Sequence, residues 1–363
     1  MESLLFSSGN IGSLDLPNRL VRSATSEWMA DDQTGHPLPK QTALYRALAR
    51  GGVGLIITGH MYVHPSGKDH KDMVGIHDDE VVPYLSEAVG AVHQEGSRVV
   101  AQISHAGMQA KTVSDPIAPS SVNLRTLKRP AREMTEAEID EVIDSFGRAS
   151  RRAKEAGFDG VQIHGGHGYL VNQFLSPLVN HRSDRWGGDA LGRMRFLRAI
   201  CESIRRQAGP DCPVLVKIGM EDHFEGGLTA DRGMQLVAEL QKMGINGVEI
   251  TGGIGLPHFS NIRKGILHEA DEAYFLPLAR KARGVTTLPI LLVGGFRSRR
   301  IMEAVLSEGS ADFISLSRPL ICEPDLPNRF RLHLQERSRC ISAGNCWPAN
   351  PGDGIGCKCH IAD

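Results

Sequence analysis

Eight short apolar runs, each followed by a longer amphipathic stretch, constrain the fold of this chain more than any other feature. Each run has about the length of a buried strand and contains β-branched residues. The runs span residues 20–25, 53–60, 98–104, 160–165, 214–219, 247–252, 289–295 and 312–318. The stretches with helical character lie near residues 40–50, 80–95, 136–156, 191–208, 229–243, 271–283, 298–308 and 324–338.

This alternation predicts an α/β fold of the (β/α)8 TIM-barrel class. Continuously apolar runs are typical of parallel strands that are buried on both faces of a sheet. The helix near 136–156 has a start signal, because Thr135 is followed three residues later by Glu138, the pattern of a capping box. Periodicity does not show whether the sheet closes, so an open doubly wound sheet is the alternative.

The length of 363 residues suits one complete barrel. We predict this barrel over residues 1–338, with a short N-terminal extension, and a Cys-rich tail over residues 339–363. A long loop rich in Pro and Ser, residues 106–134, follows the third strand.

Charge and composition exclude several classes of protein. The 41 Lys and Arg residues balance 42 Asp and Glu residues, unlike the composition of a dedicated nucleic-acid binder. No apolar run approaches the roughly 18–20 residues that span a bilayer, and no secretory signal is visible at the N-terminus. The odd number of cysteines, seven, favours reduced thiols. We therefore expect a cytoplasmic homo-oligomer that acts on a small-molecule substrate and binds neither nucleic acid nor membrane.

In a (β/α)8 barrel, functional residues gather at the C-terminal ends of the strands. Because these ends meet on one face, their side chains should form a single site. The ends of the eight runs carry polar residues and glycines: Ala24, Thr25, Ser26, Gly59, His60, Gln102, His164, Lys217, Thr251, Gly252, Gly253, Gly294, Gly295, Ser317 and Arg318.

The ends of the seventh and eighth runs predict a phosphate site. Gly294 and Gly295 allow backbone N–H groups to approach a ligand closely, and Arg318 can pair with a phosphate at the start of a helix. A tight glycine turn beside a surface arginine is the alternative interpretation.

Residues 157–188, after the fourth run, form the most specific segment of the chain. The imidazoles of His164 and His167 can donate to one carbonyl oxygen or oxyanion, and the phenol of Tyr169 can deliver a proton. A structural histidine pair is the alternative. We predict no metal here, because no Asp or Glu adjoins the pair to complete a site.

Together these segments resemble the Old Yellow Enzyme family of FMN-dependent ene-reductases, and they are also similar to the barrel domain of 2,4-dienoyl-CoA reductase. The resemblance covers about 340 residues. It rests on LPNRLVRSAT (16–25), GGVGLIITG (51–59), VVAQISHAG (99–107), DPIAPSSV (115–122), HGGHGYLVNQFLSPLVNHRSDRWGG (164–188), VGGF (293–296) and SRPLICEPDLP (317–327).

The resemblance implies FMN, held without a covalent bond at the mouth of the barrel. It places Gln102 at the flavin pyrimidine edge and Lys217 near flavin N1, and it leaves His60 where the family usually has a small residue. The remaining implied cofactor contacts are Ser23, Ala24, Thr25 and Ser26 under the flavin ring, and Gly294, Gly295, Ser317 and Arg318 at the phosphate.

The implied reaction is a ping-pong reduction, in which NAD(P)H reduces FMN and an activated alkene then takes the hydride. His164 and His167 match the pair that binds the substrate carbonyl oxygen, and Tyr169 matches the proton donor. Trp28 matches a substrate-pocket position that is often Tyr in the family. The alternatives are an amine dehydrogenase or oxidative demethylase on the same fold, and a flavin-free phosphate-binding lyase or isomerase.

The tail departs from the relatives that bind a [4Fe–4S] cluster. Ala343 stands where their second cysteine is expected, and the spacing of Cys340, Cys346, Cys357 and Cys359 does not match theirs. We predict no metal in the tail, with an iron–sulfur centre or zinc as alternatives and a packing or oligomerising role favoured.

Overall fold

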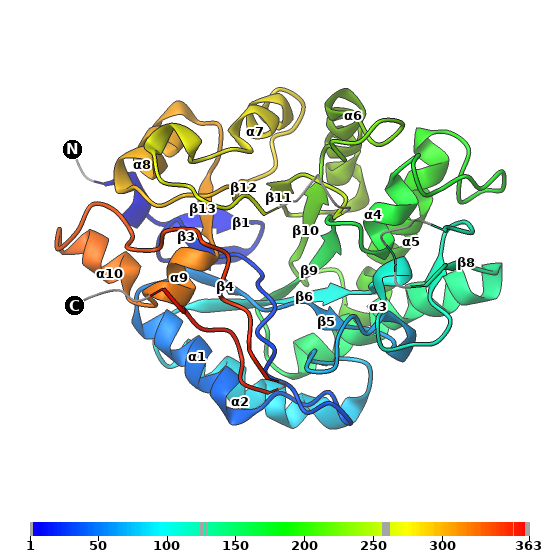
Figure 1. Ribbon diagram of the computed structural model, residues 1–363, viewed down its shortest axis with the longest axis horizontal. Coiled ribbons are helices and arrows are strands. Elements are labelled where there is room, and N and C mark those ends of the chain that lie inside the picture. Colours follow the sequence, from blue (N-terminus) through cyan, green and yellow to red (C-terminus); the bar gives the residue numbers. More distant parts are fainter. Residues whose placement is uncertain (1–2, 124–126, 128, 256–261, 351, 360–363) are drawn as a thin grey trace.

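The structure, a computed structural model, describes residues 3–123, 127, 129–255, 262–350 and 352–359. At its centre, eight parallel strands form a ring (Figure 1). In order around the ring they are β3 (Leu20–Arg22), β4 (Leu55–Ile57), β6 (Arg98–Ser104), β9 (Gly160–Gly165), β10 (Val214–Gly219), β11 (Gly247–Thr251), β12 (Ile290–Leu292) and β13 (Phe313–Leu316). The first strand, β3, pairs with both β4 and β13, so the barrel is closed and the prediction of a (β/α)8 fold is confirmed.

The interior of the barrel is filled by side chains. Val21, Leu215 and Leu291 belong to one buried cluster inside it. The antiparallel hairpin β1 (Gly9–Ile11)–β2 (Leu14–Leu16) adds Ile11 and Leu14 to this cluster. Because Ile11 packs against Gly247, the first residue of β11, the hairpin covers the N-terminal end of the barrel and leaves the other end for a ligand.

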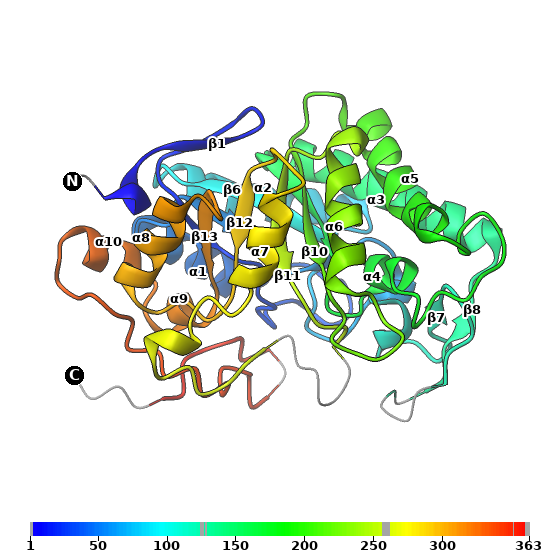
Figure 2. The same ribbon diagram turned by 90° about the horizontal axis from the view of Figure 1, so that it is seen from above.

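The helices surround the barrel (Figure 2). Their inward faces bury apolar side chains such as Leu48, Phe146 and Leu197 against the strands. They are α1 (Pro39–Arg50), α2 (Val82–His93), α3 (Glu136–Glu155), α4 (Leu170–Leu175), α5 (Ala190–Ala208), α6 (Ala230–Leu240), α7 (Leu276–Arg283), α8 (Arg299–Glu308), α9 (Arg318–Cys322) and α10 (Leu326–Arg331). The short strands β5 (Met61–Tyr62), β7 (Ile117–Ala118) and β8 (Arg132–Glu133) and the 3-10 turns η1 (Leu4–Phe6), η2 (Pro65–Gly67), η3 (Asp79–Val81), η4 (Gly107–Gln109), η5 (Gln241–Met243) and η6 (Glu269–Asp271) lie in the connections.

Two predicted helices were wrong in extent. The segment 324–338 is helical only through α10, and His333, two residues after its end, has φ +54° in the left-handed region that ends helices. The helix expected over 271–283 begins at Leu276, because Pro277 follows at a position that only the first turn of a helix tolerates. The capping box between Thr135 and Glu138 is present at the start of α3.

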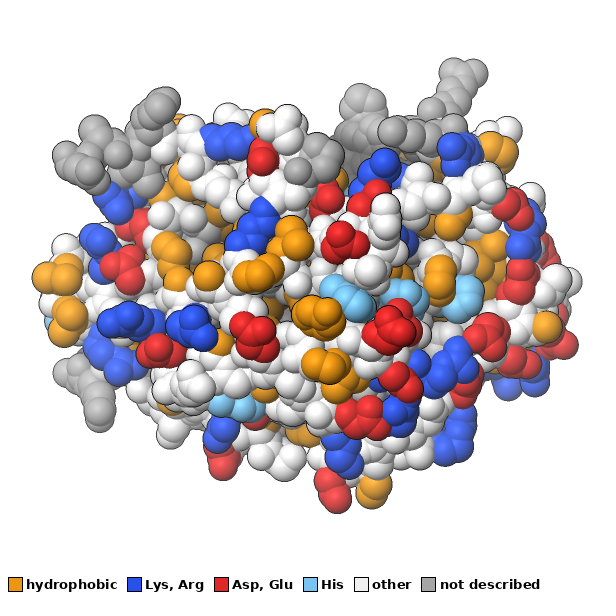
Figure 3. All heavy atoms as spheres, turned by 90° about the horizontal axis from the view of Figure 1, so that it is seen from below, with side chains coloured by type: hydrophobic (Ala, Val, Ile, Leu, Met, Phe, Trp, Pro, Cys, Tyr) orange, Lys and Arg blue, Asp and Glu red, His pale blue; other side chains and the backbone are white. Residues whose placement is uncertain are grey.

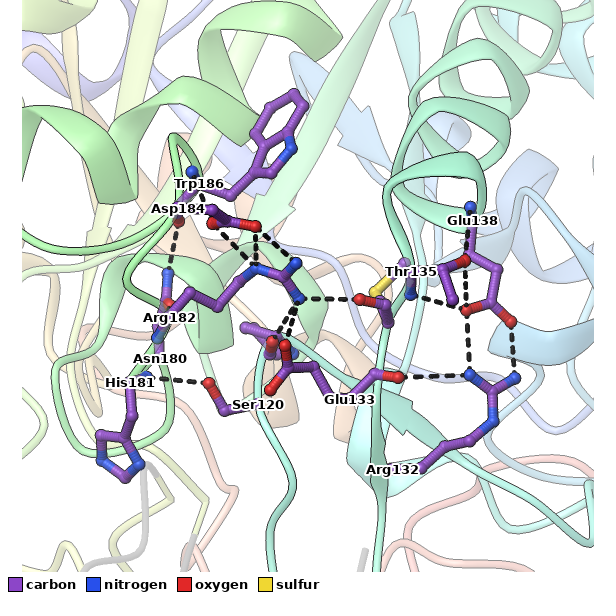
Figure 4. A network of polar contacts seen from close by, with 12 residues as sticks. Ser120, Arg132, Glu133, Thr135, Glu138, Asn180, His181, Arg182, Asp184 and Trp186 are labelled. Carbon is purple, nitrogen blue, oxygen red and sulfur yellow. Dashed lines mark hydrogen bonds and ion pairs between the residues drawn. The ribbon is translucent and has the colours of Figure 1, made fainter.

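The loop after β6 is held against the loop before α5 by Arg182 (Figure 4). The Arg182 guanidinium donates to the backbone carbonyls of Pro119 and Met134, at 2.8 and 2.7 Å, and pairs with Asp184 at 2.6 Å. Burial of this arginine side chain, which is 6% exposed, lets it join two long segments that have little regular structure of their own.

The tail after α10 passes over the open end of the barrel (Figure 1). The carbonyl of Ser342 accepts hydrogen bonds from Arg318 Nη1 at 3.1 Å and from the Gly265 N–H at 3.0 Å. Further along, the Ile355 N–H donates to the Glu27 carbonyl at 2.9 Å. The tail therefore contributes to the same end of the molecule as the predicted site residues.

Basic and acidic side chains are intermingled over the face shown in Figure 3, in keeping with the formal net charge of −1. Within the described ranges, every helix is too short or too polar to cross a membrane.

Candidate functional site

A cavity of about 750 Å³ opens at the C-terminal ends of the strands. Gly294 does not line it, and its carbonyl instead accepts from the Tyr274 N–H at 3.0 Å. Of the strand-end residues, Gly59, Gly252 and Gly253 do not line it either. All the other residues that the resemblance assigned to cofactor, substrate or catalysis do line it: Ser23, Ala24, Thr25, Ser26, Trp28, His60, Gln102, His164, His167, Tyr169, Lys217, Gly295, Ser317 and Arg318.

Lys217, on β10, carries a buried charge into this cavity. Its Nζ donates to Ser23 Oγ at 2.8 Å and lies 3.3 Å from Glu249 Oε1 on the neighbouring strand β11. Ser23 Oγ donates to the same carboxylate oxygen at 2.6 Å. Because Glu249 is fully buried, the ammonium of Lys217 is balanced by a carboxylate within the barrel.

The amides of two glutamines extend this network. Gln102 Nε2 donates to Gln162 Oε1 at 2.7 Å, and Gln162 Nε2 donates to Glu249 Oε2 at 3.1 Å. All three side chains are at most 2% exposed. The amide donor of Gln102 is thus engaged inside the barrel, which ties its orientation to the buried carboxylate.

The two histidines after β9 converge because the backbone turns sharply between them. His167 has φ +61° and Gly168 has φ +74°, and such a left-handed non-glycine residue is typical of a functional site. The ring centroids of His164 and His167 are 5.1 Å apart, and those of His164 and Tyr169 are 4.7 Å apart. His167 Nε2 lies 2.9 Å from Thr251 Oγ1, whereas His164 Nδ1 is buried without a hydrogen-bond partner among the described residues.

The phenol of Tyr169 lies between two groups from other loops. Its hydroxyl donates to Asp69 Oδ2 at 3.0 Å and lies 3.3 Å from His60 Nε2. The second oxygen of Asp69 accepts from Lys111 Nζ at 2.7 Å. The predicted proton donor, Tyr169, is therefore hydrogen-bonded to a carboxylate that is itself paired with a lysine.

Burial sets the protonation of these groups. It lowers the pKa of both His164 and His167 well below the usual range of histidine, and the nearby Lys217 lowers both values further. Burial, with a further contribution from Asp69, raises the pKa of Tyr169 well above 10. At neutral pH the site thus holds two neutral imidazoles and a protonated phenol, all of which can donate a hydrogen bond.

Trp28 forms part of the cavity wall. Its φ of +57° is strained for a non-glycine residue, and its indole stacks on His70 with ring centroids 3.8 Å apart. His70 Nε2 lies 2.8 Å from Ser26 Oγ, and burial lowers the pKa of this histidine to about 3. The stack presents a neutral, flat aromatic surface to the cavity.

The predicted phosphate end is assembled from β12, β13 and the tail. Gly295 has φ +76°, and a Cβ there would lie 2.8 Å from Tyr274 Cε1, so only glycine fits. Ser317 Oγ is 2.8 Å from Thr25 Oγ1, and Arg318 both lines the cavity and holds the Ser342 carbonyl. Ser315 Oγ is buried in the cavity wall and has no hydrogen-bond partner within the described part of the chain.

Several residues of the site were missed from the sequence. Asp69, His70 and Lys111 lie in loops, where no periodicity marks a residue that faces a cavity. Glu249 did leave a signal, since it is a charged residue within the apolar run GVEITG.

His60, Asp69 and His70 place one potential metal-ligating atom each within 4.8 Å of one another. Sequence reasoning predicted no metal, and did not foresee this cluster. Both oxygens of Asp69 already have partners, Tyr169 and Lys111, and the Lys111 ammonium beside the carboxylate disfavours a second cation. The donor set is better suited to hydrogen bonds with an organic ligand.

Three comparisons relate this chain to known proteins. The family described as NADH:flavin oxidoreductase / NADH oxidase matches residues 4–337. The NADH oxidase of Thermoanaerobacter brockii is 35% identical over 344 residues, which are 93% of this chain and 52% of that relative. The chain spans about half the length of the first curated relatives that it matches.

Two solved structures share the barrel. A complex of 2-naphthoyl-CoA reductase with 2-naphthoyl-CoA has a TM-score of 0.85 and 28% identity, over 94% of this chain and 54% of that one. An Old Yellow Enzyme homologue from Zymomonas mobilis has a TM-score of 0.79 and 26% identity, over 93% of this chain and 95% of that one. The resemblance to the Old Yellow Enzyme family is confirmed.

Proposed function

Because the chain belongs to the NADH:flavin oxidoreductase / NADH oxidase family, we propose that it uses NAD(P)H to reduce the activated C=C bond of α,β-unsaturated carbonyl compounds. The observation that carries this proposal is the convergence of His164, His167 and Tyr169 in one cavity beside the buried Lys217. The ligand of one structural relative, 2-naphthoyl-CoA, is an aromatic acyl-CoA thioester and therefore a conjugated carbonyl compound as well.

FMN is the cofactor of this family, and the residues present fit it. The cavity of about 750 Å³ holds polar groups that need a partner, such as Ser315 Oγ, which is buried without one among the described residues. Lys217 and Gln102 would hold the ring, with Ser23, Ala24, Thr25, Ser26 and His60 around it, and Gly295, Ser317 and Arg318 would hold the phosphate. When bound, FMN takes a hydride from NAD(P)H and supplies it to the β-carbon of the alkene.

The histidine pair would bind the substrate carbonyl oxygen. Both imidazoles are neutral, and His164 Nδ1 has no partner among the described residues. As hydride arrives at the β-carbon, negative charge builds on that oxygen, where preorganised donors are most effective. Losing one such donor typically costs about 3 kcal/mol of transition-state stabilisation.

Tyr169 would protonate the α-carbon. Its phenol stays protonated because burial and Asp69 raise its pKa, and it lies beside His164, so it can reach a substrate whose oxygen the imidazoles hold. The ring stack of Trp28 on His70 would orient a flat conjugated substrate from the other side.

The alternatives fit less well. An amine dehydrogenase is favoured by a free carboxylate that can pair with a substrate ammonium, but the one carboxylate in the described cavity lining, Asp69, is already paired with Lys111. Position 26 is Ser, which offers no thiol for a covalent flavin link. A flavin-free lyase or isomerase does not accord with a flavin oxidoreductase family.

Stopped-flow measurement of the two half-reactions of Tyr169→Phe tests this function. Flavin reduction by NAD(P)H needs no proton from this side chain and should stay nearly unchanged. Reoxidation by an enone should slow by ~10²-fold, because the general acid is lost, whereas a nitroolefin, whose hydride adduct is a stable anion, should suffer less.

The matched control is His164→Ala, which should instead weaken the binding of phenols that mimic the enolate oxygen. A Tyr169→Phe variant that reduces flavin slowly and turns over enones normally would contradict the assignment. A panel of enones, enoyl thioesters and N-methyl amines would then separate alkene reduction from amine oxidation.

A further inference from the structure

Asp69 and Lys111 line the cavity together with Tyr169, and alkene reduction as described above uses neither of them to carry a proton. We propose that Asp69 and Lys111 form the route by which Tyr169 regains its proton from solvent after each turnover. The inference rests on the proposed function, because the proton concerned is the one that Tyr169 gives to the alkene.

The three side chains form a continuous line from the cavity to the surface. The Tyr169 hydroxyl donates to Asp69 Oδ2 at 3.0 Å, and Lys111 Nζ donates to Asp69 Oδ1 at 2.7 Å. Asp69 is 6% exposed, whereas the Lys111 side chain is 51% exposed. The carboxylate is therefore the buried link between a phenol that faces the cavity and an ammonium whose side chain is half exposed to water.

Among the groups near Asp69, Lys111 is the cation that compensates its charge. Two histidines also face the carboxylate, but burial lowers the pKa of His60 and lowers that of His70 to about 3, so both are neutral at pH 7. Lys68, from the same loop, pairs instead with Asp32 at 3.3 Å. Burial alone would raise the pKa of Asp69, but Lys111 leads the opposing effects and the net value is below the usual range.

The need for a proton route follows from this arrangement. When Tyr169 gives its proton to the α-carbon, its O–H bond breaks, a C–H bond forms, and a phenolate is left 3.0 Å from the carboxylate of Asp69. Two adjacent anions in a buried site repel each other strongly. A proton must arrive before the next alkene can be protonated.

The transfer balances without any redox partner. A proton passes from the Lys111 ammonium to Asp69, the carboxyl group turns, and the proton passes on to the Tyr169 phenolate. Lys111, now a neutral amine, takes a proton from solvent water through its exposed end. At the close of the cycle all three groups have their starting charges, and solvent has supplied one proton.

The ion pair is not needed to hold its two loops together. The Lys111 N–H donates to the Asp69 carbonyl at 3.2 Å, and Thr112 Oγ1 donates to the Lys68 carbonyl at 2.8 Å. These bonds do not involve the Lys111 or Asp69 side chains. Removing either side chain's charge should therefore leave the loops in place.

Rapid-quench kinetics of Lys111→Met, with saturating NAD(P)H and enone under anaerobic conditions, test the route. Tyr169 starts each experiment protonated, so the first turnover should match wild type and later turnovers should be about tenfold slower, which gives a burst of one product per site. Ethylammonium should restore the later turnovers of Lys111→Ala. Lys71→Met, which removes a 73%-exposed charge from the loop that carries Asp69, is the matched control and should show no burst.

A second measurement does not depend on turnover. NMR of protein labelled with ¹³Cζ-tyrosine follows the ionisation of each phenol. The chain has five tyrosines, and the resonance that is missing from Tyr169→Phe belongs to Tyr169. Asp69→Asn should lower the pH at which this resonance titrates, since the neighbouring anion is gone, and Lys111→Met should raise it.

Linear product formation by Lys111→Met, or a Tyr169 resonance that neither variant moves, would overturn the route. If wild-type protein reduces no alkene, the proposed function fails, and the titration of Tyr169 still decides whether Asp69 and Lys111 control its proton.

Discussion

The charge of Lys217 is matched by that of Glu249 inside the barrel, with Nζ and Oε1 3.3 Å apart and both side chains at most 4% exposed. A cation beside a flavin stabilises its reduced anion, and a carboxylate in contact with the cation opposes that effect. The resemblance to known enzymes points only to the lysine. The structure adds the glutamate, so the two residues should act on the cofactor in opposite directions.

We predict that Lys217→Met lowers the two-electron reduction potential of bound FMN and that Glu249→Gln raises it. A shift of ~30 mV corresponds to about 1.4 kcal/mol, and each change should reach at least this size because the charges are buried. Spectroelectrochemical titration measures both, and Glu239→Gln, in an exposed pair with Lys242, is the control that should leave the potential unchanged. Shifts of the same sign in both variants would show that the two charges do not act as a pair.

Among the connecting elements, the turn after β12 packs closely against the cavity wall. Gly295 adopts φ +76° and its Cα faces the ring of Tyr274, which also lines the cavity. Gly309, at the end of α8, adopts a similar φ of +78° with open space around it. Comparing alanine variants of Gly295 and Gly309 therefore separates the free-energy cost of the left-handed backbone from the cost of a Cβ that clashes with a neighbour.

Alanine at either glycine should destabilise the fold by about 1–2 kcal/mol, because a Cβ is unfavourable in the left-handed region. Gly295→Ala should in addition weaken FMN binding by ~10-fold, since its Cβ would displace Tyr274 from the cavity wall. Titration of the apoprotein with FMN, followed by flavin fluorescence, measures the affinity. Equal FMN affinity in both variants would mean that this turn does not contact the cofactor.

For the molecule as a whole, buried histidines make stability depend on pH. Burial lowers the pKa of both His70 and His105 to about 3, whereas the unfolded chain has the ordinary value near 6.5. As pH falls below 6.5, the unfolded chain binds these protons and the folded protein does not. Stability is therefore present above pH 6.5 and is lost progressively between pH 6.5 and pH 3.

Denaturant unfolding at pH 7 and pH 5 should show this loss, at about 2 kcal/mol for each histidine over the 1.5 pH units below 6.5. His105→Gln should lose about 2 kcal/mol less than wild type between the two pH values, because the amide does not titrate. His93→Gln serves as the control, since His93 is a partly exposed surface residue that pairs with Asp159. A free energy of unfolding that is constant from pH 7 to pH 5 would contradict the buried, neutral state of these side chains.

The barrel and most residues of the cavity lining predicted here could be read from the sequence, because both depend on local patterns. A buried parallel strand is a continuous apolar run, and the site of such a barrel lies at the C-terminal ends of its strands, so Gln102, His164 and Lys217, in the C-terminal halves of their strands, could be placed near the mouth from the sequence. Reliance on local patterns also explains the error over residues 324–338. The apolar pattern there continues past His333, but the left-handed backbone at His333 ends the helical structure.

The partners of those residues were decided only by the tertiary structure. Asp69, Lys111 and Tyr169 come from three separate connections, and Glu249 meets Lys217 only because β10 and β11 are neighbours in register. The charge, protonation and proton supply of a buried group depend on what lies within a few ångströms of it in space. Loops have no periodicity from which such distances could be predicted. The distances are set only when the closed barrel brings the loops together.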